Sequence, residues 1–152
     1  MMLYLILKWF HILAAIIALG ANLTYPLWLA LAHRKPESLL FTLRTVKAMD
    51  DWMANPAYVL SFFTGAGMML VGQIPWSTPW IVPVLVLYGL VSVLGLTVYS
   101  PLLKKQIKLA ESIGYEAAEY KSVALRGNIL GGGISLLVVI ITFLMTVKPQ
   151  LW

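Results

Sequence analysis

The fold is decided by the stretch KWFHILAAIIALGANLTYPLWLALA, residues 8–32, which is apolar almost throughout and carries one imidazole, His11. A helix needs about 20 apolar residues to cross the roughly 30 Å of hydrocarbon in a bilayer, and this stretch exceeds that length. The apolar run begins at residue 3 and stops at the basic residues His33, Arg34 and Lys35, as a stop-transfer segment does. We therefore expect an uncleaved first membrane span over residues 3–32.

Three further apolar segments have the length of a span: residues 55–72, 80–103 and 128–147. Hydrophobic residues make up 61% of the chain, charged residues make up 11%, and the mean hydropathy is +0.86, which excludes a water-soluble domain. Lipid cannot satisfy backbone N–H and C=O groups, so each span must be a helix. The sequence predicts an all-α fold, a polytopic transmembrane four-helix bundle that forms a single domain over residues 1–152.

The basic residues predict how the bundle is oriented. Of the 11 Lys and Arg residues, only Lys8 and Lys148 lie outside the connections between spans one and two and between spans three and four. By the positive-inside rule these two connections are cytoplasmic, and both chain termini face outward. Within the connections, residues 36–47 have helical spacing and are expected to lie on the inner leaflet as an interfacial helix. The second connection is expected to be a helical linker that breaks near Gly114.

Several function classes are excluded or disfavoured by the composition. The net charge of +5 is explained by topology and by anionic lipid headgroups, so we do not expect a nucleic-acid partner. Cysteine is absent, which excludes disulfides and thiolate sites. All six acidic residues lie in the basic connections, with Asp50 and Asp51 interpreted as a solvated helix entrance, which disfavours a proton-coupled transporter. No hydrolase or kinase motif occurs, and whether the protein is an enzyme stays open.

Each span carries a stripe of small and polar residues at helical spacing, and such faces are where helices associate in lipid. They could serve only for packing, or they could enclose space for a flat ligand such as a porphyrin or a quinone. The stripes are His11, Ala15, Ala18 and Asn22 in span one; Ser61, Gly65, Met68 and Gly72 in span two; Tyr88, Ser92, Gly95 and Tyr99 in span three; and Asn128, Gly132, Ser135 and Thr142 in span four.

His11 is the main candidate ligand, because an ionisable residue inside a membrane span suggests a functional site. Neutral imidazole binds haem iron and other transition metals, whereas its structural alternative is an interhelical hydrogen bond. Met68 (or Met69) and Met145 are expected at a similar depth, so His/Met ligation of an iron is conceivable. His33 lies about 33 Å away along the same helix and cannot share that iron. The candidate cofactor-binding residues are His11, Met68, Tyr88, Tyr99 and Met145, with His11 as the metal ligand.

Short segments carry a resemblance to a known family: residues 7–11, residues 50–56, Thr64-Gly65, Pro79-Trp80 and Leu87-Tyr88. They resemble a bacterial family of predicted four-span integral membrane proteins of unknown function. The first-span histidine and the four-helix plan are more distantly similar to the HemJ-like protoporphyrinogen oxidases and the CopD-like copper-resistance proteins. That similarity implies haem or a metal at His11, but the later-span lysine of the HemJ-like group has no counterpart here.

The sequence therefore favours a multi-pass protein of the bacterial inner (plasma) membrane that binds haem b or a related redox ligand in a cavity around His11. An electron-transfer or accessory redox role would follow from such a ligand. The alternative is a non-enzymatic small-molecule carrier or a structural subunit of a larger membrane complex. The lipid bilayer is the expected partner, and a homo-oligomer is possible through the small-residue faces.

Overall fold

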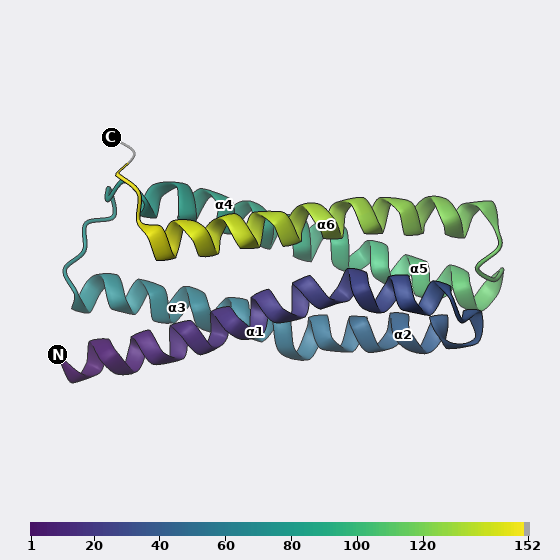
Figure 1. The fold of residues 1–152 in the computed structure, drawn as a ribbon, viewed down its shortest axis with the longest axis horizontal. Coiled ribbons are helices and arrows are strands. Elements are labelled where there is room, and N and C mark those ends of the chain that lie inside the picture. Colours follow the sequence, from purple (N-terminus) through teal and green to yellow (C-terminus); the bar gives the residue numbers. More distant parts are fainter. Residues whose placement is uncertain (151–152) are drawn as a thin grey trace.

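Four long helical rods lie side by side along one axis in the computed structural model, which describes residues 1–150 (Figure 1). The first rod is α1 (Met2–His33) and the fourth is α6 (Ala118–Val147). The second runs through α2 (Pro36–Met49), η1 (Asp50–Ala54) and α3 (Asn55–Val71), and the third through α4 (Ile81–Leu94), η2 (Gly95–Tyr99) and α5 (Ser100–Ser112). Residues 1–150 contain no strand, and all four rods are long and apolar enough to span a membrane, which confirms the predicted fold class.

Two π-helical turns, η1 and η2, interrupt the second and third rods, and each is followed closely by a proline. The Asn55 N–H donates to the carbonyl five residues back, at Asp50, and the Ser100 N–H donates in the same way to Gly95. Pro56 and Pro101 come next, and a proline has no N–H to offer the preceding turn, while its ring clashes with the carbonyl four residues back. Widening the turn to π spacing relieves that clash.

The half of the molecule that contains α2 and α5 is the basic half. There α2 packs on α1 and α5, and α6 packs on α5 and α1, so four helices close a ring. The centre of this ring is apolar and fully covered by protein, with Leu39, Leu43, Val46, Leu103 and Tyr120 among its buried residues. Ion pairs cross its surface from Arg44 to Glu111 (2.6 Å) and from Lys105 to Glu119 (3.2 Å).

The half that contains α3, α4 and both chain termini is the apolar half, and its helices are paired rather than closed. Here α3 packs along α1, where Ala14, Ala18 and Ala57 are buried together, and α4 packs along α6. Figure 1 shows the two pairs standing apart at the end with the termini. Large side chains such as Phe63 and Val86 are more than 60% exposed, as suits a surface that faces lipid.

The interfacial helix expected over residues 36–47 is not a separate element. Residues 36–49 form α2, which continues into α3 through η1 and lies against α1 instead of standing off from the bundle (Figure 1). Its apolar residues were correctly assigned to a helix, but they face the protein core because α1, α5 and α6 also extend into the basic half. The break near Gly114 is confirmed, since α5 ends at Ser112 and Gly114 has a φ of +80°.

Candidate functional site

His11 lies in the apolar half, on the side of α1 that faces α3. Its Nδ1 atom lies 2.9 Å from the Ser61 carbonyl oxygen and 3.3 Å from Thr64 Oγ1. A carbonyl oxygen can only accept, so Nδ1 carries the proton and Nε2 keeps its lone pair. A Cβ atom at Gly65 would lie 3.1 Å from His11 Cε1, which means that this glycine makes room for the ring. The interhelical hydrogen bond named as the structural alternative is therefore present.

The other predicted ligand residues are divided between the two helix pairs of the apolar half. Met68 belongs to the α1/α3 pair, whereas Met145 belongs to the α4/α6 pair, and both are half-buried. The Tyr88 hydroxyl donates to the Tyr58 carbonyl, and its ring stacks on Phe62 with the ring centroids 5.9 Å apart, so Tyr88 joins α4 to α3. Neither of the two cavities described below is lined by any of these residues.

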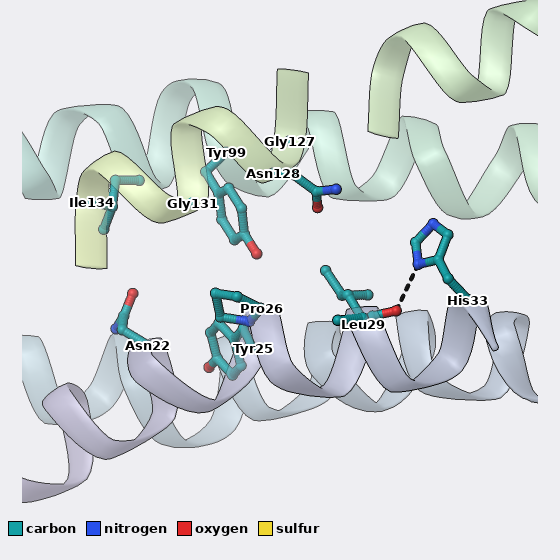
Figure 2. Close-up of a pocket in the computed structure, with 11 residues that line it drawn as sticks. Asn22, Tyr25, Pro26, Leu29, His33, Tyr99, Gly127, Asn128, Gly131 and Ile134 are labelled. Carbon is teal, nitrogen blue, oxygen red and sulfur yellow. Dashed lines mark hydrogen bonds between the residues drawn. The ribbon is translucent and has the colours of Figure 1, made fainter. Parts of the chain in front are cut away.

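Of the predicted site residues, Tyr99 lines a cleft between α1 and α6. This cleft of about 260 Å³ lies between the second half of α1 and the first half of α6, and we name it the α1–α6 cleft. Figure 2 shows the Tyr99 ring alongside Gly131 with its hydroxyl group pointing toward α1. A Cβ atom at Gly131 would lie 3.1 Å from Tyr99 Cε2, so this glycine sets how closely the ring approaches α6. Residues lining the cleft include Asn22, Tyr25, Pro26, Leu29, His33, Tyr99, Asn128, Gly131 and Ile134.

The α1–α6 cleft is apolar in its depth and polar at its basic end. Pro26, Leu29 and Ile134 supply apolar walls, while the side chains of His33 and Asn128 stand at the rim (Figure 2). The His33 Nδ1 atom lies 2.6 Å from the Leu29 carbonyl oxygen, so it donates there and leaves Nε2 as an acceptor. A half-open site with apolar walls and a few polar groups is the usual character of a small-molecule site.

A second cavity of about 250 Å³ continues from the first toward the basic end and shares His33 and Asn128 with it. Tyr115, Glu116 and Lys121 also line this second cavity. Lys121 Nζ donates to Glu116 Oε2 over 2.7 Å, and this hydrogen bond and charge hold the pKa of the Glu116 carboxyl group below its ordinary value. The two cavities together form a groove that changes from apolar to charged along its length.

Asn22 connects the cleft to two other helices. Its Nδ2 atom donates to the Tyr58 hydroxyl on α3 and to the Ala18 carbonyl, both over 2.9 Å. Its own backbone carbonyl accepts from Ser135 Oγ on α6 over 3.0 Å. This network fixes α1 between α3 and α6 at the inner end of the cleft, where the sequence stripes had placed Asn22 and Ser135 on facing sides.

Asp50 was interpreted from the sequence as solvated, and this is wrong. Its side chain lies on η1 at the junction of the two halves, and the residue is only 8% exposed. The neighbouring Asp51 is the exposed member of the pair, and Lys47 donates to it. The sequence hid this difference because the π turn changes which face of the helix each residue occupies.

The family comparison covers almost the whole chain, since a model of predicted integral membrane proteins, DUF2269, matches residues 5–149. The chain belongs to the DUF2269 family. Comparisons of this DUF2269 protein with curated proteins and with solved structures returned no match. The family supports an integral membrane protein, in agreement with the four apolar rods, and its description assigns no activity. The chemistry of this DUF2269 member therefore has to be argued from the cleft and the side chains around it.

Proposed function

We propose that this DUF2269 protein is a non-enzymatic carrier for a lipid-soluble ring compound of the quinone class, held in the α1–α6 cleft. The observation that carries the proposal is the position of the cleft between the apolar and basic halves, with apolar walls and the polar rim of His33 and Asn128. The ring of such a ligand would lie beside Pro26 and Tyr99, and its oxygens would accept hydrogen bonds from the Asn128 amide and the Tyr99 hydroxyl.

The size of the cleft favours a single ring over a porphyrin. At about 260 Å³ it lies below the roughly 300–1,000 Å³ of typical sites for drug-sized ligands, so a macrocycle would have to move helices to enter. A lipid tail attached to the ring could leave the cleft sideways between α1 and α6, because Pro26 and Asn128 are exposed. The ligand would thus reach the site from within the bilayer.

The predicted orientation would put ligand entry at one leaflet of the membrane. Under the positive-inside rule the basic half faces the cytoplasm, and both termini and the 72–80 connection face outward. For a bacterial inner membrane this puts the α1–α6 cleft at the level of the cytoplasmic leaflet. Arg34, Lys35 and Arg126 are exposed at this end and would hold anionic headgroups around the entrance.

Photoaffinity labelling with an azido-quinone tests the proposal in purified protein. Label is expected on peptides that contain residues 22–33 and 127–134, and unlabelled decylubiquinone should compete for it. Gly131→Leu should abolish this labelling because its side chain would fill the cleft against Tyr99, whereas Gly132→Leu should keep it, since nothing lies within 4 Å of that position. Labelling that excess quinone does not reduce, or that Gly131→Leu leaves intact, would overturn the proposal.

Haem b at His11 is the second candidate, and one observation favours it. A metal-binding histidine almost always donates its other ring N–H to a carbonyl or carboxylate, and the Ser61 carbonyl takes that position here. The distant similarity to HemJ-like and CopD-like proteins points the same way. Met68 lies on the same helix pair as His11 and Met145 on the other pair, and neither of the two cavities described above is lined by His11 or by either methionine. The residues present therefore fit a histidine ligand but do not enclose a porphyrin.

Visible spectra of the purified protein before and after dithionite test this second candidate. Haem binding predicts Soret and α bands that disappear in His11→Ala and remain in His33→Ala. A colourless preparation from haem-replete cells would reject it.

A structural subunit of a larger complex is the remaining alternative, and the glycines bear on it differently. Gly65 packs against His11 and Gly131 packs against Tyr99, so both glycines make contacts within the chain. Gly132 has open space in front of it, so a contact with another chain would use this part of α6. Loss of a co-purifying partner in Gly132→Leu, with azido-quinone labelling retained, would favour the subunit role.

A further inference from the structure

The Asp50 carboxyl group is an ionisable group inside the bundle, and nothing in the proposed carrier function requires it. Asp50 is 8% exposed and lies on η1, which packs against α1, α2 and α3. Tyr25 lies on α1 eight residues before His33, which puts it about 12 Å from the basic end of that helix. A carboxylate removed from water has to be hydrogen-bonded, paired with a cation, or protonated.

The nearest cation is already engaged elsewhere. Lys47, one turn before Asp50, is itself buried and donates from Nζ to Asp51 Oδ1. Asp51 has 45% of its side chain exposed, so the Lys47–Asp51 pair lies at the edge of the bundle. Asp50 is left on the inner side of this pair, where the Asn55 side chain hydrogen-bonds its carboxyl group and Lys47 is close enough for their charges to interact.

The Tyr25 hydroxyl is the second, independent feature at this level. Tyr25 is 3% exposed, and among the described residues its hydroxyl is the buried side-chain group that has no hydrogen-bond partner. Figure 2 shows this hydroxyl on the side of α1 away from Tyr99. Asp50 lies within electrostatic range of this hydroxyl, on the η1 turn that packs against α1. A buried hydroxyl without a partner is costly, so a hydrogen-bond acceptor for Tyr25 at this level would stabilise the bundle.

Other titratable groups around Asp50 come from each element at this level. Tyr58 on α3 and Tyr99 on η2 both lie within electrostatic reach of its carboxyl group, as does Tyr25 on α1. The Tyr58 hydroxyl is occupied by the Asn22 amide, whereas Tyr99 lines the α1–α6 cleft. Pro56 has no N–H, so a backbone carbonyl in the π turn lacks its helical donor. This carbonyl adds to the polarity of the site.

We propose that Asp50 is a proton-exchange site inside the bundle, with the Tyr25 hydroxyl as its hydrogen-bonding partner. The neutral carboxylic acid releases its proton to water at the edge marked by Lys47 and Asp51, and the resulting carboxylate accepts a hydrogen bond from Tyr25, directly or through one water molecule. Tyr25 and Tyr99 also line the α1–α6 cleft, so the charge on Asp50 would change the electrostatic potential at a ligand bound there. The proposal does not depend on a quinone being the occupant.

The sequence makes this site unusually easy to observe, since Asp50 and Asp51 are the only aspartates in the chain. Full-length protein labelled with [4-¹³C]aspartate, in detergent micelles, should give two carboxyl signals by carbon NMR. Asp51→Asn removes one of them and assigns the other to Asp50, even if Asp50→Asn fails to fold. Both signals are then followed from acidic to alkaline pH.

The expected result is that both carboxyls titrate and that Tyr25→Phe moves the midpoint of Asp50 by about one pH unit while leaving Asp51 unchanged. Tyr120→Phe, which removes a buried hydroxyl bound to Gln106 in the same core, is the matched control and should move neither midpoint. An Asp50 signal that does not titrate while the protein remains folded would overturn the proposal. So would a midpoint that Tyr25→Phe leaves unchanged.

Discussion

At the scale of single residues, the hydrogen bonds of Asn22 connect α1 to two other helices. The residue is buried, its amide binds α3 through Tyr58, and its backbone carbonyl receives Ser135 of α6. Interhelical hydrogen bonds in membranes contribute modestly, with an average near 0.6 kcal/mol and a maximum near 1.7 kcal/mol. Their value here is positional, because they hold three helices around the inner end of the α1–α6 cleft.

A double-mutant cycle on Asn22 and Tyr58 measures this contribution. Asn22→Ala and Tyr58→Phe should each lower the free energy of unfolding by about 1 kcal/mol, because each removes the same bond of 2.9 Å. The double variant should lose less than the sum of the two, by about 0.5 kcal/mol or more. Reversible unfolding in mixed micelles supplies the three values, and strict additivity would show that the bond contributes nothing.

The sequence could place a functional side chain along its own helix, but it could not identify the neighbours that other helices bring to that side chain. His11 was correctly singled out as an intramembrane imidazole, and its bond to the Ser61 carbonyl is the interhelical alternative that the sequence allowed. Asp50 was misassigned because its burial depends on a π turn and on three neighbouring helices. Tyr99 was grouped with His11 by spacing, but the structure places it in the cleft beside Gly131, at the other end of the membrane-spanning region.

At the scale of elements, α2 shows why amphipathic spacing alone does not fix the location of a helix. Apolar residues at helical spacing suit a membrane surface and a protein core equally well. The pattern over residues 36–47 predicted the helix correctly, and the choice between the two locations was made by partners elsewhere in the chain. Because α5 and the start of α6 extend equally far, α2 has a core to enter.

Substitutions on the two faces of α2 test this location. Leu43→Ala should cost about 2–5 kcal/mol, since Leu43 is 0% exposed and truncation would leave a cavity. Arg44→Ala should cost less than about 1 kcal/mol, because its pair with Glu111 is largely exposed to solvent. Both values come from chemical unfolding followed by circular dichroism. Equal, small effects would place α2 at the membrane surface after all.

At the scale of the whole molecule, the four spans were predictable because they follow from composition and length. Helices were expected in both connections, but the sequence did not predict that α2 and α5 would continue the second and third spans as single rods, by more than two turns. Helical spacing within a connection does not distinguish a separate helix from one that continues a span. The result is a molecule whose basic half resembles a water-soluble bundle and whose apolar half is built for lipid.

Thiol labelling tests the orientation, because the chain has no cysteine of its own. Ser77→Cys in the 72–80 connection and Ser112→Cys at the end of α5 both place a thiol at an exposed position. A membrane-impermeant maleimide added to intact cells should label only Ser77→Cys, since the positive-inside rule predicts that the basic half faces the cytoplasm. Permeabilised cells provide the control, in which both variants should react, and the reverse pattern in intact cells would invert the topology.

Pro26, Pro56 and Pro101 each remove one backbone donor from their helix, and all three lie near the junction of the apolar and basic halves. A helix bends most readily where its hydrogen-bond ladder is interrupted. We therefore expect the helices to bend most readily in this layer between the two halves, where the α1–α6 cleft lies. Stretching or thinning the surrounding bilayer would deform this layer first, so the width of the cleft is tied to the mechanical state of the membrane.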